Sequence, residues 1–123
     1  MNHRLAVLVP YRNREAHLNE FAPTLSKYLE AENIDSRIFI INQVDSCLFN
    51  RAKLLNVGFI ETRSQFTYSA YHDVDMLPTK PGAGYDYFEG ARQLYTPTAH
   101  SMGGISLVCN KVNLSVNGWS NHY

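Results

Sequence analysis

The feature that most constrains this chain is a series of short apolar runs that alternate with segments of helical period. Runs 5–9 and 37–41 lack the apolar–polar alternation of a half-exposed strand, and such runs are typical of parallel strands covered on both faces. The segment 66–72 is also strand-like. Apolar residues recur at three- and four-residue spacings over 18–29 and 48–59, as in amphipathic helices. This order predicts an α/β fold with a mainly parallel sheet and flanking helices.

Prolines and a loosely patterned second half set the other expected boundaries. Pro10 is expected to stop the first strand, and Pro23 to kink or restart the first helix, because a proline ring clashes with the preceding turn. After residue 78 no clear period is found until 105–108, which predicts a further strand. A short helix, capped by Asn110, is expected to follow over 110–116.

Composition excludes several classes of function. The 123 residues suffice for one domain, and 45% apolar residues indicate a globular chain. Eleven basic residues balance eleven acidic ones, which argues against a nucleic-acid partner because such proteins need a basic excess. No apolar run approaches a membrane span, and no secretory leader follows Met1. Cys47 and Cys109 can be paired or free.

Polar residues follow each of the three expected parallel strands. They are 10–14 after the first, Asn42-Gln43 after the second and 73–75 after the third, while Arg51 opens the second helix. Ligands of open α/β sheets bind at the carboxyl ends of strands. Arginines and carboxylates gathered there suit a diphosphate with a divalent cation. The ordinary alternatives are solvated arginines and a chance Asp-x-Asp, and His72 is expected to be a packed, hydrogen-bonded side chain.

Together these segments resemble the β-1,4-galactosyltransferase family. The matching stretches are 8–14 (LVPYRNR), 40–43 (IINQ), 49–59 (FNRAKLLNVGF), 72–78 (HDVDMLP), Gly103-Gly104 and 117–121 (NGWSN). The run from Phe49 is highly specific, whereas the Asp-x-Asp alone is not. Residues 72–75 and Leu94-Tyr95 are most similar to the branch that adds galactose to the xylose of the proteoglycan linker.

The resemblance implies a glycosyltransferase A fold that uses UDP-galactose and Mn²⁺, inverts the anomeric carbon and works in the Golgi. The acceptor is of xyloside or N-acetylglucosamine type. Asp75 is the implied metal ligand. The implied donor-binding residues are Pro10, Tyr11, Arg12, Asn13, Arg14, Phe49, Asn50, Arg51, Asp73, Val74 and Tyr95. The physical interpretation agrees, because carboxylate and phosphate oxygens suit Mn²⁺.

Two departures from the family pattern shape the expectation for function. Ser101 stands where the family has an aromatic residue, and the implied catalytic base and acceptor loop would lie beyond Tyr123. We therefore expect 1–123 to be the N-terminal donor-binding part of a galactosyltransferase domain, unable to transfer galactose by itself. One alternative is a non-catalytic truncated paralogue that binds a UDP-sugar and Mn²⁺ or only folds. Another is a transferase for a different donor, such as UDP-N-acetylgalactosamine.

Overall fold

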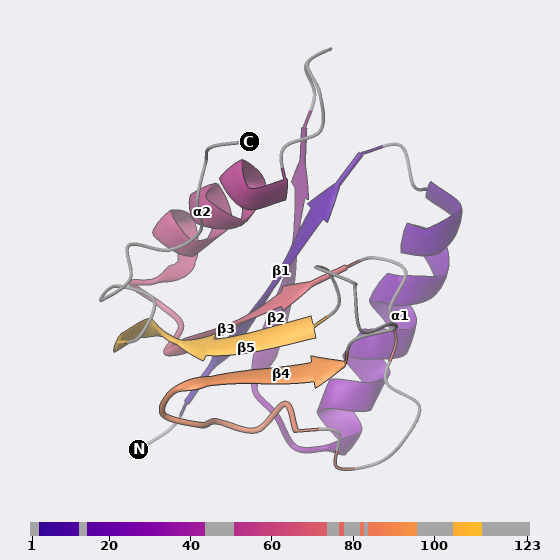
Figure 1. Cartoon of the computed structure of the whole chain (residues 1–123). Coiled ribbons are helices and arrows are strands. Elements are labelled where there is room, and N and C mark those ends of the chain that lie inside the picture. Colours follow the sequence, from indigo (N-terminus) through magenta and orange to yellow (C-terminus); the bar gives the residue numbers. More distant parts are fainter. Residues whose placement is uncertain are drawn as a thin grey trace.

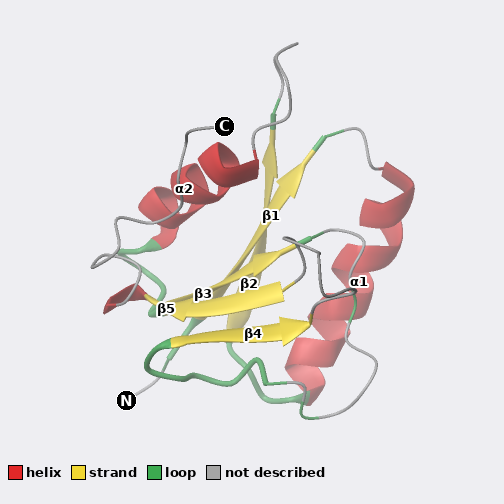
Figure 2. Cartoon of the chain, in the orientation of Figure 1, coloured by secondary structure: helices red, strands yellow, loops and turns green. Residues whose placement is uncertain are grey.

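In the part of the chain that it describes, the computed structural model has a five-stranded sheet with a helix against each face (Figures 1 and 2). It describes residues 3–12, 15–43, 51–73, 77, 82, 84–95 and 105–111. The elements are β1 (Leu5–Tyr11), α1 (Glu15–Ala31), β2 (Ser36–Asn42), α2 (Arg51–Thr62), β3 (Tyr68–His72), β4 (Ala91–Tyr95) and β5 (Ile105–Cys109). The strand–helix–strand–helix–strand order predicted for the first 72 residues is confirmed.

The sheet is mixed, with the strand order β2-β1-β3-β5-β4. β1 runs parallel to β2 over its whole length and parallel to β3 as far as the pair Leu8–Tyr71. β5 is antiparallel to both β3 and β4. The expected strand at 105–108 is confirmed, whereas β4 had no counterpart among the sequence predictions. Because β2 and β3 lie on opposite sides of β1, the direction of winding reverses at β1.

Alternate residues of β1 supply two separate cores. Leu5, Val7 and Val9 pack with α1 residues such as Leu25, and Ala6 and Leu8 pack with α2. The two helices accordingly cover opposite faces of the sheet (Figure 1). Each fully buried leucine contributes about 1.5–3 kcal/mol relative to an exposed one, which explains why an unalternating apolar run occupies the central strand. Neither described helix is long and apolar enough to cross a membrane.

Pro10 does not stop the first strand, and α1 does not restart at Pro23. Pro10 lies buried inside β1, which continues to Tyr11. It is tolerated in a central strand because the pairing with β3 has already ended at Leu8, so a missing N–H costs little on that side. Pro23 lies within an unbroken α1 on its exposed side. The Asn19 carbonyl that loses its helical partner is likewise on an exposed residue, where water can replace the bond.

The end of α1 is fixed by a left-handed residue. Asn33 has a φ of 60°, its N–H donates to the Glu30 carbonyl over 3.0 Å, and the next N–H, of Ile34, donates to the Leu29 carbonyl over 3.0 Å. This pair of bonds is the Schellman arrangement, in which asparagine replaces the more usual glycine. It turns the chain directly into β2.

Asn110 ties the end of β5 to the turn that precedes β3. Its Nδ2 donates to the Phe66 carbonyl over 2.6 Å and to the Arg63 carbonyl over 3.1 Å. The predicted helix 110–116 lies outside the described residues after Lys111. Cys109 is a buried free thiol, and Cys47 lies in an undescribed segment.

Candidate functional site

The carboxyl ends of the three parallel strands form the candidate site. Tyr11 and Asn42 end β1 and β2 in register, and the Gln43 N–H donates to the Tyr11 carbonyl over 3.1 Å. β1 continues to Tyr11 beyond its last pair with β3. Because the winding reverses at β1, this edge is the switch point at which doubly wound sheets bind their ligands.

The structure brings four predicted site residues to this edge with their side chains described. Pro10 and Tyr11 are buried at the end of β1, and the half-buried Arg12 follows them. The half-buried Asp73 comes directly after β3. A basic and an acidic side chain thus leave neighbouring strands at the same end of the sheet, as the sequence predicted.

Two further predicted residues are placed by their backbones alone. Arg51 is the first residue of α2, whose start follows the carboxyl end of β2 along the chain. Tyr95 ends β4 opposite Ile105, and Ile105 lies opposite His72, so β3 and β4 finish at the same level. Six predicted residues lie outside the described segments, and their roles stay predictions: Asn13, Arg14, Phe49, Asn50, Val74 and Asp75.

His72, the last residue of β3, is completely buried. Its Nε2 lies 2.8 Å from the Tyr85 hydroxyl, and its Nδ1 lies 2.9 Å from the Asp73 carbonyl oxygen. The Phe21 ring of α1 meets the imidazole edge-on, with centroids 5.0 Å apart. The prediction of a packed, hydrogen-bonded histidine is therefore confirmed, and the contact with Asp73 joins this packing to the candidate site.

Tyr85 is a functional candidate that the sequence did not reveal. Only 2% of it is exposed, and its own carbonyl accepts a hydrogen bond from the Tyr68 hydroxyl over 2.7 Å. Burial raises the pKa of the Tyr85 phenol well above its usual value, with a smaller effect from Tyr28. Burial, followed by Asp86, raises the pKa of Tyr68 to about 12. Both phenols are thus neutral hydrogen-bond donors at physiological pH.

The side-chain oxygen atoms at this edge fit a cation that prefers oxygen ligands and that is held partly by the phosphate oxygens of a bound diphosphate. Asp73 offers a carboxylate, whereas both nitrogens of His72 are engaged by protein oxygens. Within the described segments, no group of three or more His, Cys, Asp or Glu side chains could hold a metal ion by itself. One or two carboxylates completed by phosphate oxygens is the usual arrangement for a cation bound with a diphosphate.

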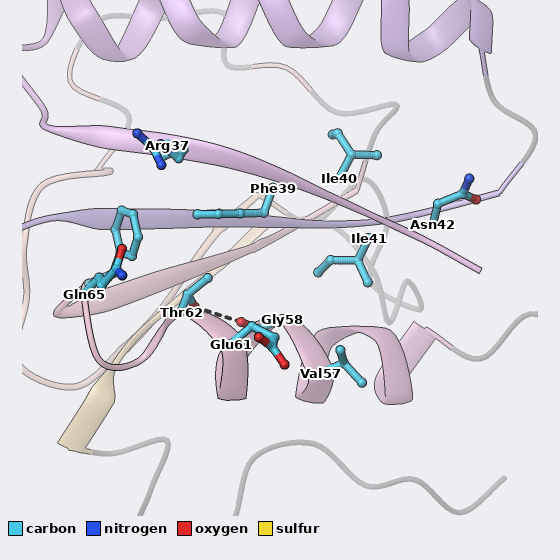
Figure 3. A pocket seen from close by; sticks show the side chains of 11 residues that line it. Arg37, Phe39, Ile40, Ile41, Asn42, Val57, Gly58, Glu61, Thr62 and Gln65 are labelled. Atoms are coloured by element: carbon cyan, nitrogen blue, oxygen red, sulfur yellow. Dashed lines mark hydrogen bonds between the residues drawn. The ribbon is translucent and has the colours of Figure 1, made fainter. Parts of the chain in front are cut away.

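A groove of about 510 Å³ runs along the outer edge of the sheet, between β2 and α2 (Figure 3). Its apolar part is formed by residues such as Phe39, Ile41 and Val57, and Arg37 and Glu61 add charge. The Thr62 hydroxyl, which also borders the groove, donates a hydrogen bond to the Gly58 carbonyl over 2.8 Å. Of the predicted donor residues that the structure describes, none lines this groove, but Asn42 at the end of β2 does, so the groove reaches the edge of the candidate site.

A doubly wound sheet with an arginine and a carboxylate at its switch point is compatible with the glycosyltransferase A type of fold that the motif resemblance implied. The sequence profile of the N-terminal region of glycosyl transferase group 7 matches residues 1–86. The chain belongs to that family. This confirms the resemblance to the β-1,4-galactosyltransferases drawn from the motifs.

Individual relatives point to the xylose-specific branch. The chain is 42% identical over 132 residues to a xylosylprotein 4-beta-galactosyltransferase of Caenorhabditis elegans and 40% identical over 129 residues to beta-1,4-galactosyltransferase 7 of Homo sapiens. These matches cover 98% of this chain but 45% and 39% of the two relatives. The chain thus spans less than half the length of these relatives.

Solved structures give the same result for the fold. The catalytic domain of Drosophila beta-1,4-galactosyltransferase 7 in complex with xylobiose superposes with a TM-score of 0.90 at 37% identity. A mutant of that enzyme in complex with manganese, UDP-Gal and xylobiose gives 0.92 at 38% identity. Each match covers 98% of this chain and 55% of the other. The predicted partial glycosyltransferase A fold is confirmed.

Proposed function

We propose that residues 1–123 are the donor-binding part of a β-1,4-galactosyltransferase that transfers galactose from UDP-galactose to xylose with inversion, in the Golgi. The observation that carries the proposal is the placement of Arg12 and Asp73 directly after β1 and β3, at the same end of the sheet. The support from relatives is the 42% identity to a xylosylprotein galactosyltransferase and the fold shared with an enzyme solved with UDP-Gal.

The residues that leave β1 and open α2 bind the nucleotide and its diphosphate. Guanidinium groups pair phosphate oxygens in bidentate fashion, and this is the role of Arg12, Arg14 and Arg51. The first turn of α2 adds backbone N–H groups at a positive helix end, which favours an anion. Pro10, Tyr11, Asn13, Phe49 and Asn50 shape the nucleotide site around them.

The residues after β3 hold the cation and close the site. Asp75 ligates Mn²⁺, Asp73 and Val74 lie against the donor, and Tyr95 contacts it from the end of β4. When bound, the cation supplies charge that stabilises the departing UDP. Carboxylates that follow β3 are suited to holding the cation, because oxygen atoms are the ligands available at this edge. None of the described residues is assigned as the catalytic base.

Isothermal titration of the 123-residue chain with UDP, in the presence and absence of Mn²⁺, tests the proposal. We expect Mn²⁺-dependent binding that Asp75→Asn abolishes. Asp35→Asn is the matched control, because Asp35 lies before β2 at the opposite end of the sheet and its 3.3 Å ion pair with Arg4 is exposed. Equal binding by wild type and Asp75→Asn would refute the metal role.

A competition series identifies the donor sugar. UDP-galactose, UDP-N-acetylgalactosamine and UDP-glucose are titrated against labelled UDP in the presence of Mn²⁺. Preference for UDP-galactose supports the proposed donor, whereas preference for UDP-N-acetylgalactosamine indicates the related transferase. UDP bound without any sugar preference fits a non-catalytic nucleotide-binding paralogue.

A further inference from the structure

The hydrogen bonds of His72 have a defined direction. The Asp73 carbonyl oxygen can only accept, so the 2.9 Å contact places the ring proton on Nδ1. In the neutral ring Nε2 is then an acceptor, and it receives the Tyr85 hydroxyl proton over 2.8 Å. A buried tyrosine whose pKa is raised keeps that proton. The bonds therefore run from Tyr85 through His72 to the carbonyl of Asp73.

Tyr85 is itself held from two directions. From β3, the Tyr68 hydroxyl donates to the Tyr85 carbonyl. From α1, the Tyr28 ring packs edge-on against the Tyr85 ring at 5.7 Å, and the Tyr28 hydroxyl donates to Glu32, whose carboxylate also accepts the Gly82 N–H over 2.6 Å. The segment around Tyr85 is thus fastened to the same helix and strand that build the core.

The acceptor at the end of this series of bonds is significant for the site. The Asp73 carbonyl belongs to the peptide unit that joins Asp73 to Val74, which is where the chain leaves β3 toward Asp75. A hydrogen bond to that oxygen restrains the plane of the peptide that follows Asp73, at the point where the chain leaves β3. Groups that orient metal ligands from behind commonly affect metal affinity 10–100-fold.

We propose that His72, held by Tyr85, is a positioning residue that sets the Asp73–Val74 peptide and so preorganises the Asp-x-Asp segment for the cation and the diphosphate. This inference rests on the proposed function of the site. It assigns a role to Tyr85, a residue ten positions beyond the motif in sequence, and explains why a fully buried histidine occupies the last position of β3.

The test compares two buried hydroxyl groups of which only one is linked to His72. Tyr85→Phe removes the donor to His72. Thr62→Val, on α2 against the other face of the sheet, removes an equally short bond to the Gly58 carbonyl. His72→Leu removes the whole linkage, and His72→Asn retains a donor close to the Nδ1 position. Mn²⁺-dependent UDP affinity is measured by titration, at a temperature at which circular dichroism shows every variant to be folded. Amide ¹⁵N–¹H spectra of the ligand-free proteins report on residues 73–75.

We expect Tyr85→Phe and His72→Leu to bind UDP about tenfold more weakly with Mn²⁺, Thr62→Val to bind like wild type, and His72→Asn to recover most of the loss. The amide signals of 73–75 should shift in Tyr85→Phe and not in Thr62→Val. If wild type binds and Tyr85→Phe and Thr62→Val are alike in affinity and spectra, the positioning role is overturned while the proposed function stands. If wild type shows no Mn²⁺-dependent binding, the proposed function fails, and the positioning role fails with it.

Discussion

Gly58 is the point at which α2 lies closest to the sheet, and a methyl group there makes a quantitative test of the packing. A Cβ at this position would overlap Cδ1 of Ile41 on β2 and lie 3.2 Å from Cδ2 of Leu8 on β1. Figure 3 shows Gly58 on the side of α2 that faces Ile41. The perturbation is Gly58→Ala, alone and combined with Ile41→Val, which deletes the overlapping Cδ1 atom.

The expected magnitudes follow from three contributions. Alanine gains about 1 kcal/mol over glycine inside a helix, and overpacking costs about 1–3 kcal/mol. The cost lies in the lower part of that range because Ile41 is half-buried and only the end of its side chain must move. Gly58→Ala alone should therefore lower the free energy of unfolding by about 0–1 kcal/mol, while Ile41→Val costs about 0.5 kcal/mol at a half-buried site.

The double variant should be more stable than the sum of the two single effects predicts. With Cδ1 removed, the helix gain of Gly58→Ala is restored, so the double variant should gain about 0.5 kcal/mol over wild type. The coupling is then about 1–2 kcal/mol. Urea unfolding followed by circular dichroism measures it, with an unchanged m-value as the condition for comparison. Ile60→Ala, an exposed change on the same helix, combined with Ile41→Val is the control. Effects of Gly58→Ala and Ile41→Val that add within about 0.5 kcal/mol would refute the close approach.

Three further perturbations test other parts of the fold by the same unfolding assay. The contribution of the Tyr68 phenol to the free energy of unfolding should be fully present below about pH 10 and fall toward pH 12, by up to about 1.4 kcal/mol per pH unit, because its folded pKa of about 12 exceeds the ordinary value of 10.0. Tyr68→Phe should reduce the slope of the free energy of unfolding against pH. An unchanged slope contradicts the assignment. Asn33→Gly should raise the free energy of unfolding by up to about 1 kcal/mol, and Asn33→Ala should lower it by about 1 kcal/mol, because the φ of 60° suits glycine. An alanine variant more stable than the glycine variant would exclude the left-handed cap. Asn110→Ala should cost about 1–3 kcal/mol by leaving the Phe66 carbonyl without its 2.6 Å donor, whereas the exposed Asn19→Ala should change little.

The sequence was sufficient where burial on both faces dictates the pattern. Runs 5–9 and 38–41 are apolar without alternation because β1, and less completely the half-buried edge strand β2, lie between two helices. The site followed from the same logic, because polar residues after buried parallel strands must meet at one edge. The prediction for Pro10 was wrong because the free-energy cost of its missing N–H depends on whether the neighbouring strand still pairs at that position. The local sequence does not show where that pairing ends.

The second half was less predictable because its contacts are not local. β4 is an edge strand of mixed polarity, so its residues carry no period. The antiparallel direction of β5 depends on how the chain returns after 95, and no spacing signals it. Tyr85 lies in a segment without regular structure, and its importance comes from a histidine on β3 that it reaches only in the folded chain.

The division of the interior into two cores has a consequence for the order in which a nascent chain can fold. The core against α2 consists of Ala6, Leu8, Leu55, Phe59, Phe66 and Tyr71, all of which have left the ribosome once β3 has emerged. The core against α1 also needs Tyr85, Ile105, Leu107 and Cys109. One side of β1 can therefore close early in synthesis, while the other side, which contains the ring of Tyr85, waits for a further stretch of translation. During that interval the part of the α1 core that these later residues cover stays exposed to solvent.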